Sequence, residues 1–211
     1  PGNPLMSITD LRACCEEYSK DADIFVAVDN TFATPVLTRP LELGADIVMH
    51  SATKYLGGHS DALGGFLVAK SKEVFDDLYF IQNATGAVMS PFDAFLVSRG
   101  MKTLDLRVRA QCETALQIAS WLDADNRVSR VLYPGLTQHR GYDVALKQMN
   151  GGFGAMVSFE VLGGFDAARA MANNTELFQL AVSLGAVESL IEQPASMSHA
   201  SYDRDDRLLH G

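Results

Sequence analysis

Residues 47–61 read IVMHSATKYLGGHSD, and this stretch says most about the fold. An apolar run from Ile47 to Met49 ends in small polar residues around Lys54, and two glycines follow. Apolar runs bounded in this way are typical of a parallel strand that is buried on both faces. Lys54 would then follow the carboxyl end of a buried strand, at the edge of an open α/β sheet where ligands bind.

The flanking residues predict alternating helices and strands. Upstream, residues 7–20 predict a helix, residues 23–30 (DIFVAVDN) predict another buried strand, and residues 38–44 predict a short helix. Downstream, residues 64–71 predict a third strand and residues 71–83 a further helix. Such an alternation is typical of a sheet that is wrapped by helices.

The second half of the chain predicts a smaller α/β unit. Ser90 to Leu122 predicts either two helices or one long bent helix, with a domain boundary near residues 103–109. Strand-like and helical segments follow it, at residues 128–135, 142–150, 155–164 and 165–174. We therefore predict two domains, residues 1–105 and residues 106–211.

Composition excludes several classes of function. The chain has 211 residues, is 47% hydrophobic and carries a formal net charge of -9. It has no cluster of five basic residues, so nucleic acid and anionic membranes are poor partners. No apolar run is long enough to predict a membrane span. Three cysteines, two of them adjacent, fit a reducing cytoplasm better than a disulfide framework, and we expect no metal site.

Two charged residues at predicted strand ends could carry chemistry. Asp29 ends an apolar run, and a buried carboxylate needs a partner; the alternative is a structural acid that caps the following turn. Lys54 in a dry pocket would have a lowered pKa and could form a Schiff base, while Ser51 and Thr53 could bind a phosphate. Together these features describe a site for pyridoxal phosphate (PLP). The alternative is an exposed lysine in a glycine-rich turn.

Five stretches resemble one enzyme family. Residues 28–61 resemble the PLP-binding stretch of the Cys/Met metabolism enzymes, which include cystathionine γ-lyases and γ-synthases, methionine γ-lyases and O-acylhomoserine sulfhydrylases. Residues 1–4 (PGNP) resemble the end of that family's E-S-P-x-N-P motif, and residues 99–108 resemble R-G-L-K-T-L-x-x-R. Residues 133–136 and 181–201 resemble its C-terminal motifs. The resemblance implies fold type I (aminotransferase-like), with a mostly parallel sheet wrapped by helices and a smaller C-terminal α/β domain.

The resemblance also implies roles for residues that would hold the cofactor. Lys54 is similar to the Schiff-base lysine that later acts as general base, and Asp29 to the acid that pairs with the pyridinium nitrogen. Ser51 and Thr53 would bind the phosphate. Asn3 would reach the phenolic oxygen of the cofactor and the substrate carboxylate.

Other residues bear on the substrate. By resemblance, Ser183 would lie beside the substrate carboxylate. The preceding position is often Glu in family members that handle cystathionine, and here it is Val182, as in methionine γ-lyases. In contrast, residues 57–61 (GGHSD) are more similar to the cystathionine enzymes. We expect a carbon–sulfur γ-lyase acting on cystathionine or methionine, with cystathionine γ-synthase or O-acylhomoserine sulfhydrylase as the alternative.

The resemblance further implies a cytoplasmic homotetramer, built as a dimer of dimers, in the full-length form. It also implies segments that this chain lacks: the upstream glycine-rich phosphate loop and a C-terminal segment whose arginine grips the substrate carboxylate. We therefore expect a piece of a longer enzyme that is inactive alone. An alternative of another class is an inactive or structural piece that works only when a partner supplies the missing segments.

Overall fold

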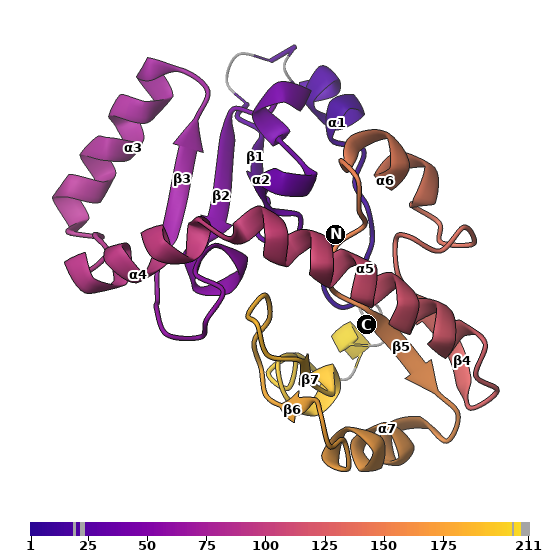
Figure 1. The fold of residues 1–211 in the computed structure, drawn as a ribbon. Helices are drawn as coiled ribbons and strands as arrows, with labels where there is room; N and C mark the ends of the chain where they lie inside the picture. The colour runs from indigo at the N-terminus through magenta and orange to yellow at the C-terminus, as the bar shows by residue number, and fades with distance from the viewer. Residues whose placement is uncertain (19, 22–23, 204, 208–211) are drawn as a thin grey trace.

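A three-stranded mixed sheet organises the first half of the chain. The computed structural model describes residues 1–18, 20–21, 24–203 and 205–207 (Figure 1). The strands β1 (Ala27–Asp29), β2 (Ile47–Ser51) and β3 (Gly65–Ala69) lie in that order, with β1 parallel and β3 antiparallel to β2. We expected a mostly parallel sheet, but only one of the two strand pairings in this sheet is parallel. The chain leaves β2 and enters β3 at the same edge of the sheet, so β3 must run back.

The burial of the strands also differs from expectation. Only β2 alternates between half-buried and buried residues, whereas Ala27 and Asp29 of β1 and most of β3 are exposed. The prediction of a buried strand over residues 23–30 is therefore wrong for β1, and Asp23 lies outside the described residues. The physical reason is that β1 and β3 are edge strands, while β2 has a neighbour on each side.

The helices of the first half agree better with the sequence. The predicted helix over residues 7–20 is α1, and Ser19 lies outside the described residues. The segment from residue 90 to residue 122 forms two helices, α4 and α5, as one of the two alternatives predicted. The elements are α1 (Leu11–Tyr18), α2 (Thr34–Leu37), the 3-10 helix η1 (Pro40–Leu43), the π-helix η2 (Ala52–Leu56), α3 (Lys72–Thr85), α4 (Pro91–Met101) and α5 (Leu104–Asp123).

The second half contains two small sheets. The strands β4 and β5 pair antiparallel, and β6 and β7 pair parallel. The helices α6 and α7 confirm the helices predicted over residues 142–150 and 165–174. The elements are β4 (Val128–Leu132), α6 (Tyr142–Gln148), β5 (Ser158–Val161), α7 (Gly164–Asn173), β6 (Gln179–Leu180), β7 (Leu190–Ile191) and the 3-10 helix η3 (Pro194–Ser196).

The core has two apolar clusters that share α5. Figure 1 shows α5 running across the molecule between the β1–β3 sheet and the β4–β5 pair. One cluster joins η2 and α4 to the first half of α5 and to α6; it contains Ala52, Tyr55, Leu56, Val97, Leu104, Val108, Cys112, Ala145 and Met149. The other packs the second half of α5 on β4 and contains Ala115, Ala119, Leu122, Val131, Tyr133 and Leu136. The first cluster crosses the predicted boundary between residues 105 and 106, so η2, which carries Lys54, shares one packed core with α5.

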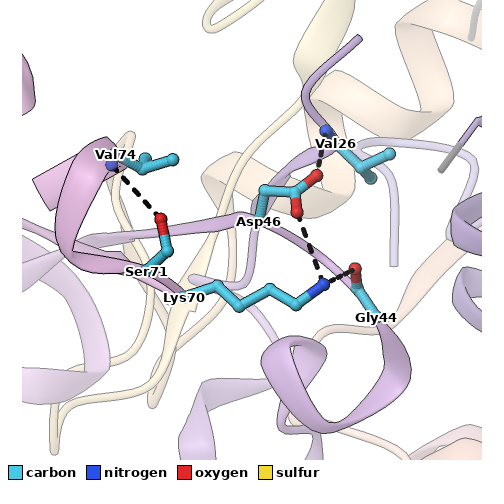
Figure 2. A network of polar contacts seen from close by, with 6 residues as sticks. All are labelled: Val26, Gly44, Asp46, Lys70, Ser71 and Val74. Carbon is cyan, nitrogen blue, oxygen red and sulfur yellow. Dashed lines mark hydrogen bonds and ion pairs between the residues drawn. The ribbon is translucent and has the colours of Figure 1, made fainter. Parts of the chain in front are cut away.

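A polar network joins the three strands at the end of the sheet that lies away from Lys54 (Figure 2). The Asp46 carboxylate, just before β2, accepts a hydrogen bond from the Val26 N–H at 3.0 Å. The Lys70 ammonium, just after β3, lies 3.5 Å from the other Asp46 oxygen and donates to the Gly44 carbonyl at 3.2 Å. At the start of α3, the Ser71 hydroxyl accepts the Val74 N–H at 3.3 Å. This network fixes the three strands at one end and leaves the other end free for a site.

Within the described residues, no helix has both the length and the apolar composition that a membrane crossing requires. The same residues contain no group of three or more His, Cys, Asp or Glu side chains that could hold a metal ion.

Candidate active site

The predicted site residues gather at one edge of the β1–β2 pair. The two strands are parallel, with Asp29 in register with Met49, so their carboxyl ends lie at the same edge. Asp29 ends β1, Ser51 ends β2, and Thr53 and Lys54 lie in η2 directly after it. The structure therefore places these four residues together, as the strand pattern predicts.

Lys54 occupies an irregular turn of backbone. Its φ and ψ of −94° and −124° break the π-helix η2, and the turn ends at Gly57. The half-buried Lys54 ammonium donates to the Ser183 hydroxyl at 3.2 Å. No carboxylate forms an ion pair with Lys54 among the described residues. The amine is thus held by a neutral hydroxyl from a segment 129 residues away and is not neutralised by an acid.

Asp29 and Ser51 are linked through Thr31. One Asp29 carboxylate oxygen accepts the Thr31 N–H at 2.9 Å, and the Thr31 hydroxyl accepts the Ser51 N–H at 2.8 Å. Thr31 is buried, whereas Asp29 is exposed. The contact to Thr31 caps the turn after β1, as one of the two interpretations of Asp29 expects, and it leaves the second carboxylate oxygen without a hydrogen-bond partner among the described residues.

The two predicted phosphate-binding hydroxyls differ in their contacts. The Thr53 hydroxyl accepts the Gly64 N–H at 3.1 Å and lies 3.4 Å from the Gly64 carbonyl. The Ser51 hydroxyl has no hydrogen-bond partner among the described residues. Ser51 is therefore free to bind a ligand, while Thr53 would have to exchange its contacts with Gly64.

The predicted substrate residues are less tightly placed. Asn3 and Val182 have exposed side chains, with Val182 55% exposed. Burial lowers the pKa of the Pro1 amino group, and the Asp29 carboxylate opposes that shift, so the N-terminal segment lies near Asp29 at this end of the sheet. Ser183, beside Val182, contacts Lys54 directly.

The segment that carries Ser183 is fastened to the Lys54 loop by its backbone. The Val187 N–H donates to the Gly58 carbonyl at 3.0 Å. Gly185 has a φ of +84°, and a Cβ there would lie 2.6 Å from the Tyr55 nitrogen. A glycine is needed at this position because any side chain would push the Ser183 segment away from Lys54.

Three residues at the site were missed by the sequence analysis. Thr31 has no signal in the sequence beyond its place after Asp29, and Arg107, which donates to the Tyr55 carbonyl, lies in a motif that indicates no role for it. His50 lies on β2 with its Nδ1 buried and unpartnered, and burial lowers its pKa while Asp29 opposes that shift. The contacts of Thr31 and Arg107 join segments that are distant in the sequence, and the burial of His50 depends on the packed sheet, so a single sequence displays none of the three.

These contacts define a donor set with a specific chemistry. Judged from the part of the chain that the structure describes, it comprises an amine without an acid partner, a carboxylate with one free oxygen and a free hydroxyl, all at one strand edge. An amine can bind a carbonyl carbon, a carboxylate can hold a protonated ring nitrogen, and a hydroxyl can bind a phosphate. The residues present fit PLP.

Comparisons with known proteins agree with this chemistry. The sequence model of the Cys/Met metabolism PLP-dependent enzyme family matches residues 1–211. The chain is 47% identical, over its whole length, to the L-methionine gamma-lyase of Fusobacterium nucleatum subsp. polymorphum, and covers 53% of that protein. It is 50% identical to the cystathionine gamma-lyase of Bacillus subtilis strain 168, again over its whole length, and covers 55% of it.

A solved structure superposes equally well. It is the cystathionine gamma synthase of Xanthomonas oryzae pv. oryzae, in complex with aminoacrylate and cysteine. The match has a TM-score of 0.96 and 49% identity over the whole of this chain and 54% of the other. The chain thus spans about half the length of the curated relatives it matches.

Proposed function

We propose that this chain, which belongs to the Cys/Met metabolism PLP-dependent enzymes, serves a carbon–sulfur lyase that acts on cystathionine or methionine by γ-elimination. The observation that carries the proposal is the Lys54 amine, which donates to a neutral hydroxyl at 3.2 Å and, within the described residues, pairs with no carboxylate. A structural surface lysine gains nothing from this arrangement, since its charge is best satisfied by water or an acid.

The cofactor would be held by residues at the strand edge. The Lys54 amine would bind the aldehyde carbon, Asp29 would pair with the ring nitrogen, and the Ser51 and Thr53 hydroxyls would bind the phosphate. Asn3 would bind the phenolic oxygen of the cofactor. When bound, PLP supplies an electron sink for negative charge that develops at the substrate Cα, and a protonated ring nitrogen makes that sink stronger.

Lys54 would also move protons. With substrate bound, the Lys54 Nζ would take the proton from the substrate Cα. In γ-elimination a second proton leaves Cβ before the sulfur group departs from Cγ, and the same amine can carry it. The Ser183 hydroxyl, 3.2 Å from Nζ, orients the amine between these tasks.

Substrate selection would involve Asn3, Ser183 and Val182. Asn3 and Ser183 would bind the substrate carboxylate. The exposed Val182 cannot bind a charged distal amino group, which cystathionine has and methionine lacks. The alternative is γ-replacement by a cystathionine γ-synthase or an O-acylhomoserine sulfhydrylase. The 49% identity to the Xanthomonas synthase supports this alternative. Release of 2-oxobutanoate and ammonia from cystathionine or methionine, without a second substrate, separates the lyase from the synthase.

We also propose the finer architecture. The β1–β3 sheet is then the part of a fold type I cofactor domain that lies within residues 1–105, and residues 106–211 belong to the smaller domain. The full-length form would be a cytoplasmic homotetramer, a dimer of dimers. Exposed aromatic side chains on α3 and α4, namely Phe75, Tyr79, Phe80, Phe92 and Phe95, support burial of this face against further protein. Sedimentation of the full gene product tests the assembly.

The test of the function is borohydride reduction in the presence of PLP, followed by peptide mass spectrometry. We expect a pyridoxyl group on Lys54 in the full gene product and none in the Lys54→Ala variant. An adduct in the full product but not in the 211-residue chain would favour the inactive-piece alternative for the chain alone. No adduct at Lys54 in either would refute the proposed function.

A further inference from the structure

Arg107 fastens the Lys54 loop to the helices behind it. Its Nη1 donates to the Tyr55 carbonyl at 2.9 Å, and Tyr55 directly follows Lys54. Its Nη2 donates to the Gly100 carbonyl at 2.8 Å, and its Nε donates to the Thr103 hydroxyl at 3.1 Å. One guanidinium therefore joins η2, the end of α4 and the turn before α5.

The acceptors around Arg107 are all neutral. Its described contacts are two carbonyls and a hydroxyl, with no carboxylate among them. Burial lowers the pKa of Arg107, yet a guanidinium keeps its charge. On the same helix, Arg109 instead pairs with Asp105 at the surface, 3.0 Å away. A half-buried cation without an acid partner is unfavourable unless its N–H groups are hydrogen-bonded. The guanidinium N–H groups of Arg107 donate to backbone carbonyl and hydroxyl oxygens, which offsets this cost.

The Tyr55 carbonyl depends on this donor. The irregular backbone at Lys54 leaves η2 with hydrogen bonds from Gly57 N–H to the Ala52 carbonyl and from Gly58 N–H to the Lys54 carbonyl. Among the described residues, the Tyr55 carbonyl receives no backbone N–H and is bound by Arg107. Since buried carbonyls are costly to leave unpaired, removing Arg107 would favour a different backbone path at the residue next to Lys54.

Two glycines make room for this contact. Gly58 has a φ of +73°, and a Cβ there would lie 2.2 Å from Arg107 Nη1. A Cβ on Gly100 would lie 2.1 Å from the Gly57 carbonyl oxygen. The loop, α4 and the guanidinium are thus in direct contact, so a displacement of Arg107 is transmitted to the backbone beside Lys54.

We propose that Arg107 is a positioning residue for Lys54: by holding the Tyr55 carbonyl, it places the Lys54 amine at the point that the cofactor aldehyde must reach. This inference rests on the proposed function of Lys54. Arg107 is not among the residues that we propose to bind cofactor or substrate; its hydrogen bonds go to Thr103, Tyr55 and Gly100. Its effect is confined to the bond between Lys54 Nζ and the aldehyde carbon, which forms with loss of one water molecule.

Two probes separate positioning from general stability. PLP can form this bond, whereas pyridoxine 5'-phosphate carries an alcohol in place of the aldehyde and cannot. In the full gene product, Arg107→Met should weaken PLP binding by at least about ten-fold, the effect of one lost hydrogen bond to a charged group. It should change the binding of pyridoxine 5'-phosphate by less than about two-fold. Arg107→Lys should restore part of the PLP affinity, and Arg109→Met, the control on the same helix, should change neither.

The outcomes decide the inference separately from the proposed function. Equal losses with both probes, or no loss with either, would show that Arg107 has only a structural role or none. If Arg107→Met does not fold, the same comparison is made with Arg107→Lys, which keeps the charge but not the fork. Absence of the Lys54 adduct in the unmodified protein would refute the proposed function itself, whatever the variants do.

Discussion

The close approach of Gly100 to the Lys54 loop leads to a prediction whose sign can be worked out. Gly100 is buried near the end of α4, and its backbone packs directly on the backbone of Leu56 and Gly57. A Cβ built there would lie 2.1 Å from the Gly57 carbonyl oxygen and 3.0 Å from the Leu56 carbonyl oxygen. Both neighbours are backbone atoms, so neither can rotate away as a side chain would.

Two opposing effects determine the stability of Gly100→Ala. In an open helix the change is favourable by about 0.8–1 kcal/mol, because alanine has the higher helix propensity. Overpacking a close contact costs about 1–3 kcal/mol, and a contact with backbone belongs at the upper end of that range. The difference is a net loss of about 1–2 kcal/mol. The clash should therefore outweigh the propensity.

The assay is urea unfolding of the full gene product, with Ser98→Ala as the control. Ser98 is exposed on the same helix, so its replacement should be neutral or stabilise by a few tenths of a kcal/mol. Gly100→Ala should unfold at a lower urea concentration than the unmodified protein. A midpoint equal to or above that of the unmodified protein would mean that α4 does not press on the loop, and the packing described here would be wrong.

Three further predictions follow from the contacts. Thr31→Val should leave the Ser51 N–H without its acceptor and lower the free energy of unfolding in urea by about 1–2 kcal/mol. Thr31→Ser should recover most of this loss, because the serine hydroxyl can accept the same N–H. Equal losses in both variants would contradict the link. Asp46→Ala should cost about 1 kcal/mol because it removes an acceptor from the network in Figure 2, whereas Asp76→Ala, in an exposed ion pair, should change little; equal effects would contradict the network. Burial lowers the pKa of His50 below its ordinary 6.5, so the unfolded chain binds the proton first and stability falls as pH drops through about 6.5. His50→Gln should therefore flatten urea midpoints measured between about pH 7.5 and 5.5, and an unchanged slope would show that other groups control it.

The sequence predicted the local order of helices and strands well, but the sheet less well. The helical patterns over residues 90–122, 142–150 and 165–174 correspond to helices, because helical periodicity reports a nearby packed face. The same kind of pattern could not give the direction of β3 or the exposure of β1. Direction depends on where the connecting loop turns, and exposure depends on which strands lie beside it.

By itself, the sequence determined that Asp29 ends one strand and that Lys54 closely follows the next, because an apolar run that stops at polar residues is a local signal. Only the tertiary structure decided which distant groups surround them. Ser183 reaches Lys54 across 129 residues, and Arg107 reaches Tyr55 across 52. Such contacts depend on how α5 and the segment around Gly185 pack on the loop, and packing is a property of the folded chain as a whole, which no short stretch of residues encodes.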